Sequence, residues 1–126
     1  MARTSVRRGE VWLINLDPTV GAEIKKTRPA VIVNDDAVGA LPLRVIVPLT
    51  EWKERFAVAP WLVRVEPDAE NALEKASAAD AFQVRSVSQQ RFVRLLGKLS
   101  EPAMQEVTRA LATVLSIASA TPSTPA

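Results

Sequence analysis

Residues 21–34 read GAEIKKTRPAVIVN, a charged loop that opens with glycine and runs into a β-branched strand. A second strand of the same kind, VIVPLT, follows at residues 45–50 and ends in a hydroxyl. If the two strands pair, Glu23, Arg28 and Thr50 converge at one rim of a small sheet. A carboxylate, a guanidinium and a hydroxyl together can hold a phosphodiester and move its protons. The sequence contains no other obvious site, so we expect the function to lie here.

Working outward from this pair, apolar and β-branched runs predict further strands, separated by turn-forming residues. The predicted strands are 11–16, 30–34, 44–50, 61–66, 80–87 and 92–96. Pro48 marks the third of them as irregular, or at an edge, near its end. Long loops are expected at 17–27 and 51–60, and residues 67–79 are expected to form a loop or a loose turn of helix.

One amphipathic helix closes the chain. Ser100 can cap its N-terminus, and Pro102 occupies an early position that helices accept. Apolar residues then recur at spacings of three and four, which predicts a single stripe packed on the sheet. This stripe consists of Met104, Val107, Leu111, Val114, Leu115 and Ala118.

Five or six short strands followed by one helix predict a mainly β fold, a small curled antiparallel sheet or barrel with the C-terminal helix packed on it. We assign residues 1–118 to a single domain, in which residues 1–8 form a loose basic arm. Residues 119–126 hold only Ser, Thr, Pro and Ala, and we expect this tail to be disordered.

The composition excludes much chemistry. The 126 residues include no cysteine and no histidine, which removes disulfides, thiolate and histidine metal sites, histidine triads and the two-histidine route to RNA cleavage. Catalysis has to use Asp, Glu, Lys, Arg, Ser or Thr, and we expect neither a metal nor another cofactor. No apolar run approaches the roughly 20 residues that cross a bilayer. Because a signal segment is also lacking, we expect a soluble cytoplasmic protein with no membrane partner.

Charge is distributed unevenly, although the net charge is only +2. Residues 66–80 hold five acidic residues against one lysine. Residues 83–98 hold no acid and four cations, Arg85, Arg91, Arg94 and Lys98. A basic segment next to an acidic one suits a polyanion-binding face with an opposite side, or simply two solvated surfaces.

The loop at 51–60 interleaves Trp52 and Phe56 with Lys53 and Arg55. Such a pattern is typical of loops that grip single-stranded nucleic acid by stacking and phosphate contact. A loop tryptophan that folds back on the core explains the pattern equally well.

Several short motifs occur in a fixed order along the chain. The first ones are RGEVW at 8–12, LDP at 16–18, GAE at 21–23 and TRPAVIV at 27–33. The later ones are VPLT at 47–50, QVRSV at 83–87 and GKL at 97–99, followed by the closing helix. In this order and spacing they resemble the MazF/PemK-like toxins of bacterial type II toxin–antitoxin pairs, and the resemblance spans about residues 8–117.

The resemblance implies an SH3-like barrel that forms a homodimer and acts as a sequence-specific endoribonuclease on single-stranded RNA without a metal. It also implies a cognate MazE-like antitoxin that covers the RNA groove. In the family the reaction is attributed to the residues that match Arg28 and Thr50, and Glu23 matches a position that is functional in some members. Asp80 lies near a position where some relatives use an acid, but its spacing from Gln83 departs from their pattern.

Cleavage of RNA without a metal uses the 2′-OH as nucleophile and leaves a 2′,3′-cyclic phosphate and a 5′-OH. Arg28 is suited to hold the phosphorane because its planar fork can bind two phosphate oxygens. Thr50 can donate one more hydrogen bond, and Glu23 can serve as the base if its surroundings raise its pKa toward neutral. The candidates for RNA contact are Lys25, Lys26, Thr27, Gln83, Arg85 and Trp52.

Other interpretations stay open at this point. Arg28 could cap its strand against Asp17, Thr50 could be an ordinary strand-end hydroxyl, and Glu23 with Lys25 could be a solvated loop pair. The fold also suits a CcdB-like toxin that poisons gyrase, or a non-catalytic interaction module. A gyrase poison would not need Arg28 and Thr50 together, which counts against it.

Overall fold

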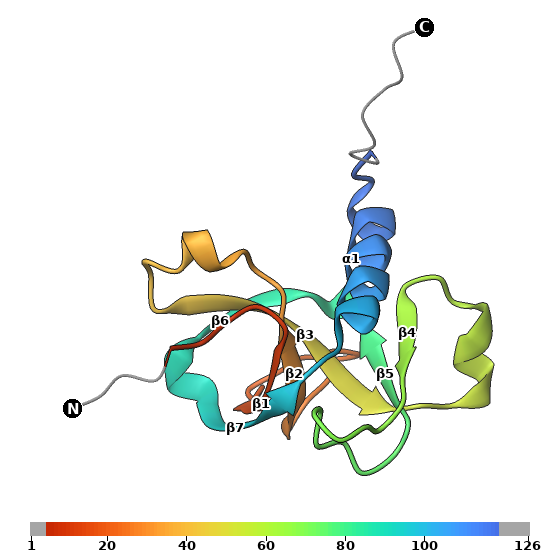
Figure 1. The fold of residues 1–126 in the computed structure, drawn as a ribbon, viewed down its shortest axis with the longest axis horizontal. Helices are drawn as coiled ribbons and strands as arrows, with labels where there is room; N and C mark the ends of the chain where they lie inside the picture. The colour runs from red at the N-terminus through yellow and green to blue at the C-terminus, as the bar shows by residue number, and fades with distance from the viewer. Residues whose placement is uncertain (1–4, 119–126) are drawn as a thin grey trace, which may run out of the picture.

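The computed structural model describes residues 5–118, shown in Figure 1, so the predicted tail at 119–126 lies outside the described residues. The strands are β1 (Glu10–Asn15), β2 (Thr27–Ile32), β3 (Leu43–Glu51), β4 (Leu62–Val65), β5 (Ser77–Asp80), β6 (Arg85–Ser88) and β7 (Phe92–Lys98). They are followed by the helix α1 (Glu101–Leu115). Single turns of 3₁₀ helix are η1 (Asp36–Val38), η2 (Glu54–Val58), η3 (Ala81–Gln83) and η4 (Gln89–Arg91).

All strand pairs are antiparallel, in the order β4-β5-β3-β2-β1-β7, with β6 also paired to β3. This confirms the predicted mainly β fold with a C-terminal helix. Among residues 5–118 the seven-stranded sheet curls without closing, because its end strands β4 and β7 each pair on one side only and not with each other. The barrel expected from the sequence is therefore an open one.

The central strand β3 changes partners along its length. Its first half pairs with β6 through Leu43–Ile46, and its last residues pair with β5 through Leu49–Glu51. Pro48 lies at the change, where a residue without an N–H is tolerated. The predicted pairing with β2 is confirmed, since Ala30 faces Pro48 in the register of the two strands. Pro48 thus marks an irregularity in a central strand, and the alternative of an edge strand is wrong.

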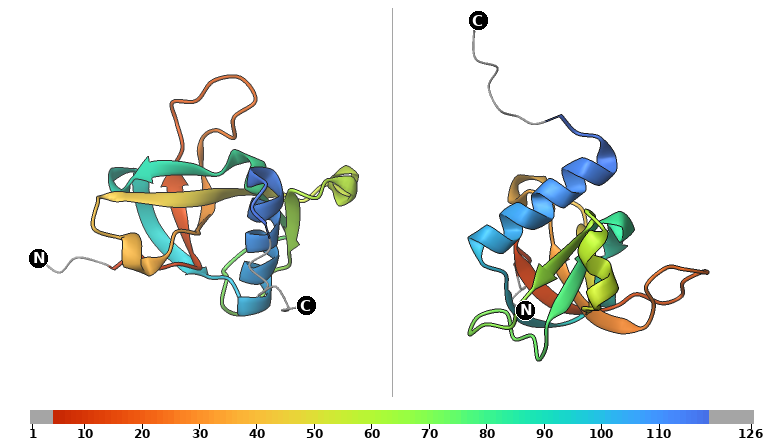
Figure 2. Two further views of the ribbon diagram at one scale, coloured as in Figure 1. Left: turned by 90° about the horizontal axis from the view of Figure 1, so that it is seen from above. Right: turned by 90° about the vertical axis from the view of Figure 1, so that its right-hand side faces the viewer.

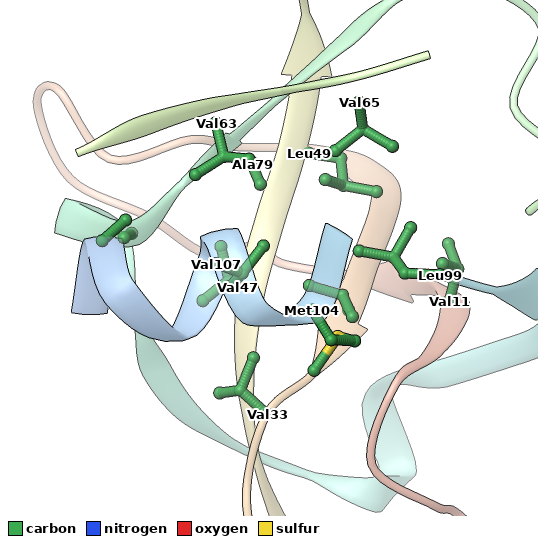
Figure 3. Packing of buried hydrophobic residues seen from close by; sticks show 13 residues of the cluster. Val11, Val33, Val47, Leu49, Val63, Val65, Ala79, Leu99, Met104 and Val107 are labelled. Carbon is green, nitrogen blue, oxygen red and sulfur yellow. The ribbon is translucent and has the colours of Figure 1, made fainter. Parts of the chain in front are cut away.

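Each face of the sheet carries a cluster of buried apolar side chains. The sheet is curled, and α1 packs on the cluster of one face (Figures 1 and 2). One cluster contains Val11, Val31 and Val47, which alternate with the members of the other cluster along the same strands. Figure 3 shows Met104 and Val107 of α1 packed on the first cluster. These contacts position the strands that carry the functional residues.

The helix follows the prediction at its start and differs from it at its end. The Ser100 hydroxyl accepts a hydrogen bond from Ala103 N at 3.2 Å, which confirms the N-cap. Of the predicted stripe, Met104 and Val107 are buried, whereas Leu115 is 54% exposed. The helix ends at Leu115, because Ser116 adopts the left-handed conformation that closes many helices.

Two predictions in the middle of the chain are wrong. Residues 80–87 do not form one strand, because Asp80 ends β5 and its carboxylate accepts from Phe82 N at 3.1 Å to start η3. Residues 67–79 are not all loop, because they contain most of β5. Its Ala78 and Ala79 carry little strand propensity but are completely buried between β3 and β4.

The end of the predicted basic arm is attached to the body. The Arg8 guanidinium donates to Val33 O and to the Thr108 hydroxyl, the latter at 2.8 Å. This part of the arm is therefore not loose. Among the described residues, no helix is both long and apolar enough to cross a membrane.

Candidate active site

The C-terminal part of β3 borders two neighbouring cavities. The Arg28 cavity, of about 540 Å³, is lined by Leu13, Arg28, Pro29, Leu49, Thr50, Glu51, Ala72, Leu73, Glu74, Lys75, Ser77, Arg94 and Leu96. The Phe82 cavity, of about 480 Å³, is lined by Leu16, Ala22, Glu23, Ile24, Pro48, Trp61, Asp80, Phe82, Gln83, Val84 and Arg85. Both cavities border β3, where Pro48 lines one of them and Thr50 the other.

The Arg28 cavity is lined by residues of five strands, β1, β2, β3, β5 and β7, and of the loop before β5. Leu13 of β1 pairs with Pro29 of β2 on one side and with Arg94 of β7 on the other, and all three line the cavity. The register of β2 with β3, in which Ala30 faces Pro48, brings Arg28 level with Thr50. The structure therefore brings Arg28 and Thr50 together as the sequence predicted.

Arg28 and Thr50 keep their polar groups open to a ligand. The half-buried Arg28 forms one hydrogen bond with the described residues, from Nε to Lys25 O at 2.8 Å. This contact orients the guanidinium and leaves its two terminal nitrogens unpaired within residues 5–118. Neither an ion pair to Asp17 nor any hydrogen bond of the Thr50 hydroxyl occurs among these residues. The alternative in which Arg28 caps its strand against Asp17 is wrong.

Further charged side chains surround this pair. Arg94 and Lys75 add two cations to the Arg28 cavity, and Lys75 Nζ lies 3.6 Å from Glu51 Oε1. Both members of that pair are more than half exposed, so it adds little stability. Glu74 of the acidic segment and Arg94 of the basic segment thus line the same cavity.

Glu23 lies outside the Arg28 cavity. Its carboxylate accepts from Val20 N at 2.8 Å within the loop that joins β1 to β2, called loop 16–26, and it lines the Phe82 cavity. The predicted convergence therefore holds for two of the three residues. Glu23 shares its cavity with Asp80, whose pKa is raised, chiefly by burial, against the opposing effect of hydrogen bonds from Phe82 and Gln83.

Two predicted RNA-contact residues hold loop 16–26 in place. The Gln83 carboxamide accepts from Ile24 N at 2.5 Å and donates to Ala22 O at 3.2 Å. The Arg85 guanidinium donates through one nitrogen to Leu16 O at 3.2 Å. Both side chains also line the Phe82 cavity, and Arg85 has further nitrogens to offer a ligand.

The remaining predicted contacts fall on two different surfaces. Lys25, Lys26 and Thr27 are exposed where loop 16–26 enters β2, and they line neither cavity. Trp52 packs edge-on against Phe56, with ring centroids 5.8 Å apart, and lines a groove beside α1. Trp52 therefore does not join Arg28 and Thr50, and its ring packs against Phe56 of its own loop and beneath Arg64.

A second aromatic pair, which sequence reasoning missed, lies at the candidate site. Trp61 and Phe82 form an edge-to-face pair with ring centroids 5.8 Å apart, and both line the Phe82 cavity. Phe82 was expected to be an apolar position of a strand. Because η3 interrupts that strand, its side chain points out of the core and is 64% exposed.

Comparisons with known proteins agree on one family. Residues 7–115 match the family described as PemK-like, MazF-like toxin of type II toxin-antitoxin system. The chain is 32% identical over 112 residues to "Endoribonuclease MazF9" of Mycobacterium tuberculosis, a match that covers 84% of this chain and 92% of that protein.

Solved structures show the same fold. MazF from Deinococcus radiodurans superposes with a TM-score of 0.77 at 21% identity, covering 91% of this chain and all of that one. An endoribonuclease from a mycobacterial species, in complex with its cognate antitoxin, superposes with a TM-score of 0.70 at 21% identity. That match covers 89% of this chain and 96% of the mycobacterial one.

Proposed function

This chain belongs to the PemK-like, MazF-like toxin family of type II toxin–antitoxin systems and is therefore an endoribonuclease. We propose that it cuts single-stranded RNA at a short sequence without a metal ion. The observation that carries the proposal is the placement of Arg28 and Thr50 on adjacent strands of one cavity, with the terminal nitrogens of Arg28 and the Thr50 hydroxyl unpaired among residues 5–118.

In the proposed reaction the 2′-OH of a ribose attacks the adjacent phosphorus while the bond from phosphorus to O5′ breaks. The leaving O5′ takes up a proton from water, and the products are a 2′,3′-cyclic phosphate and a 5′-OH. The terminal nitrogens of Arg28 bind the non-bridging oxygens and stabilise the charge that develops on the phosphorane. Thr50 donates a hydrogen bond to one of these oxygens, and Arg94 adds positive charge at the same cavity.

The proton of the 2′-OH needs an acceptor. We assign this role to Glu23, as the sequence suggests, and name Glu51 as the second candidate because it lines the Arg28 cavity itself. A pH–rate profile of Glu23→Gln and Glu51→Gln separates the two, because only loss of the base removes the acidic limb of the profile.

The proposal extends to partners. Lys25, Lys26 and Thr27 contact the RNA backbone from the exposed end of loop 16–26. A MazE-like antitoxin covers the RNA groove, and the chain forms a homodimer in the cytoplasm, where cutting mRNA, rRNA or tRNA inhibits translation and growth. Solved MazE–MazF complexes of Deinococcus radiodurans support the antitoxin as a partner.

The test is to incubate the purified chain with a long unstructured RNA in excess EDTA and to map the cut ends. Arg28→Ala is expected to lower the cleavage rate at least about 10²–10³-fold and to change the stability by no more than about 1 kcal/mol. Arg109→Ala, on the exposed surface of α1, is the matched control and keeps full activity.

Cuts at one short motif that leave 5′-OH ends and disappear in Arg28→Ala establish the proposed activity. Intact RNA with a folded wild-type chain rejects it and moves the search to gyrase poisoning or to a non-catalytic interaction. An active and folded Arg28→Ala variant rejects the assignment of Arg28.

A further inference from the structure

Phe82 is an unusually exposed aromatic residue in a fold of this size. Its side chain is 64% exposed and its partner Trp61 is 36% exposed. Full burial of a phenylalanine stabilises a protein by about 1.5–3 kcal/mol, and most of that gain is lost at this position. Exposed apolar groups that gather at a cavity mark a binding surface more often than an accident of folding.

The polar groups around this pair suit a flat heteroaromatic ring. The floor of the Phe82 cavity is apolar, formed by Leu16, Ile24 and Pro48. Asp80 and Arg85 stand at its edge and supply an acceptor and a donor. A nucleobase combines an apolar face with donors and acceptors around its rim, and proteins bind unpaired bases by stacking and by hydrogen bonds to those edges.

The Phe82 cavity borders the same part of β3 as the Arg28 cavity. Pro48 lines the Phe82 cavity and Thr50 lines the Arg28 cavity. Two residues along a strand span about 6.7 Å, so the two cavities border adjacent positions of β3, and an RNA strand that binds at Arg28 can continue toward the Phe82 cavity.

The aromatic pair Trp52 and Phe56 differs from the pair Trp61 and Phe82 in what covers its rings. Trp52 and Phe56 have nearly the same geometry, with centroids 5.8 Å apart and planes at 86°, against 5.8 Å and 87° for the pair at Phe82. However, the Arg64 guanidinium lies over Trp52 and that of Arg55 over Phe56. Among residues 5–118 no cation lies over the ring of Trp61 or of Phe82, and Phe82 is 64% exposed.

We propose that Trp61 and Phe82 form a subsite for one nucleobase next to the scissile phosphate, in which the base stacks on Phe82 and its edge is read by Asp80 and Arg85. This inference rests on the proposed function and adds a sequence-selecting residue to it. Gln83 does not read the base in this arrangement, because its carboxamide is engaged by Ile24 N and Ala22 O.

The experiment uses non-cleavable RNA with a 2′-deoxy sugar at the mapped cut, together with a series in which one flanking base at a time is removed. Phe82→Ala is expected to weaken binding of the intact RNA on the order of tenfold, the scale of one base–aromatic stack. Removing the base that occupies the subsite should weaken wild type equally and add no further loss in Phe82→Ala. Phe82→Trp restores binding, and Phe56→Ala serves as the matched control and binds like wild type.

Three outcomes overturn the inference. One is wild-type affinity and wild-type cut sites in Phe82→Ala. Another is a loss in Phe82→Ala that no single base removal cancels. The third is unchanged RNA binding with weakened antitoxin binding or weakened self-association, which would make the pair a protein interface. If the wild-type chain cuts RNA and one of these outcomes is found, the proposed function stands and only the base subsite is rejected.

Discussion

Two loops wall the neighbouring cavities, and the fold holds them in different ways. The loop between β4 and β5, called loop 66–76, borders the Arg28 cavity and is organised around Asn71, which is 1% exposed. Asn71 Nδ2 donates to Glu66 O at 2.9 Å, and its Oδ1 accepts from Asp68 N at 3.2 Å and Leu73 N at 3.0 Å. The buried Asn71 side chain thus forms hydrogen bonds with backbone groups of the loop that have no partner in a strand or helix.

The same loop is pressed against the sheet. Lys98 N of β7 donates to Glu70 O at 3.0 Å, and a Cβ at Gly97 would overlap that carbonyl oxygen. Glycine is therefore required at 97 so that the two backbones can approach.

Loop 16–26 is held far less firmly. Both loops are mostly exposed, but loop 16–26 has no buried polar side chain comparable to Asn71, and it projects from the body of the molecule in both views of Figure 2. Its attachment to β6 and η3 runs through the side chains of Gln83 and Arg85. Loop 66–76, beside the Arg28 cavity, is thus anchored by a buried side chain and a close backbone contact. Loop 16–26, beside the Phe82 cavity, is held at β6 and η3 through side chains only, and we expect it to open locally more readily.

The largest effect on stability is expected from disrupting the contact between loop 66–76 and β7. Gly97→Ala should destabilise the protein by roughly 3 kcal/mol, because the new methyl group overpacks a backbone contact. Gly21→Ala in loop 16–26 is the matched control: Gly21 has φ +59° with open space around it, so only strain of about 1 kcal/mol is expected. Urea denaturation of both variants measures the difference. Equal destabilisation by the two substitutions would remove the distinction between the loops.

Removing the organising side chain should have the next largest effect. Asn71→Ala leaves Glu66 O, Asp68 N and Leu73 N without their partner, which is expected to lower the free energy of unfolding by about 2 kcal/mol. Cleavage activity should fall as well, because Leu73 and Lys75 line the Arg28 cavity. Denaturation and cleavage assays check both parts, and a stable variant with a displaced loop would contradict the first.

Gln83→Ala is expected to release loop 16–26 without unfolding the protein. Losing its two hydrogen bonds removes about 1 kcal/mol of local stability, so trypsin should cut at Lys25 and Lys26 on the order of fivefold faster. The midpoint of urea denaturation should stay nearly unchanged. Gln90→Ala, at an exposed position, is the control and should be cut at the wild-type rate. A cooperative loss of global stability in Gln83→Ala would show that this loop also belongs to the core.

The smallest effect is expected at Asp80, where burial raises the pKa of the carboxyl above its ordinary value of 3.8. The folded protein then keeps this proton to a higher pH than the unfolded chain does. The contribution of Asp80 to stability therefore falls as pH rises from about 3.8 through the raised pKa, and it stays low above it.

Asp80→Asn removes that penalty and can still accept from Phe82 N. The variant should be slightly more stable than wild type at neutral pH, and the difference should shrink as the pH approaches 3.8. Paired urea titrations across this range check it. A difference that grows on acidification would mean that the carboxylate is stabilised in the folded state.

The sequence by itself determined the parts that are encoded locally. The β-branched runs around Val31 and Val47 gave their own strands and implied their pairing, and Ser100 with its apolar stripe defined most of α1. The ordered motifs indicated the family, and with it the pair Arg28 and Thr50. These signals could be read because strand and helix periods, caps and turns act between residues close in the chain.

Tertiary structure alone decided which distant residues meet. β5 could not be predicted, because its alanines form a strand only where β3 and β4 leave a narrow space. Strand registers bring Arg28, Thr50 and Arg94 to one cavity. Arg64 and Arg55 lie over the rings of Trp52 and Phe56, whereas the pair Trp61 and Phe82 lines the second cavity. Such contacts depend on neighbours supplied by the whole fold, so no local pattern carries them.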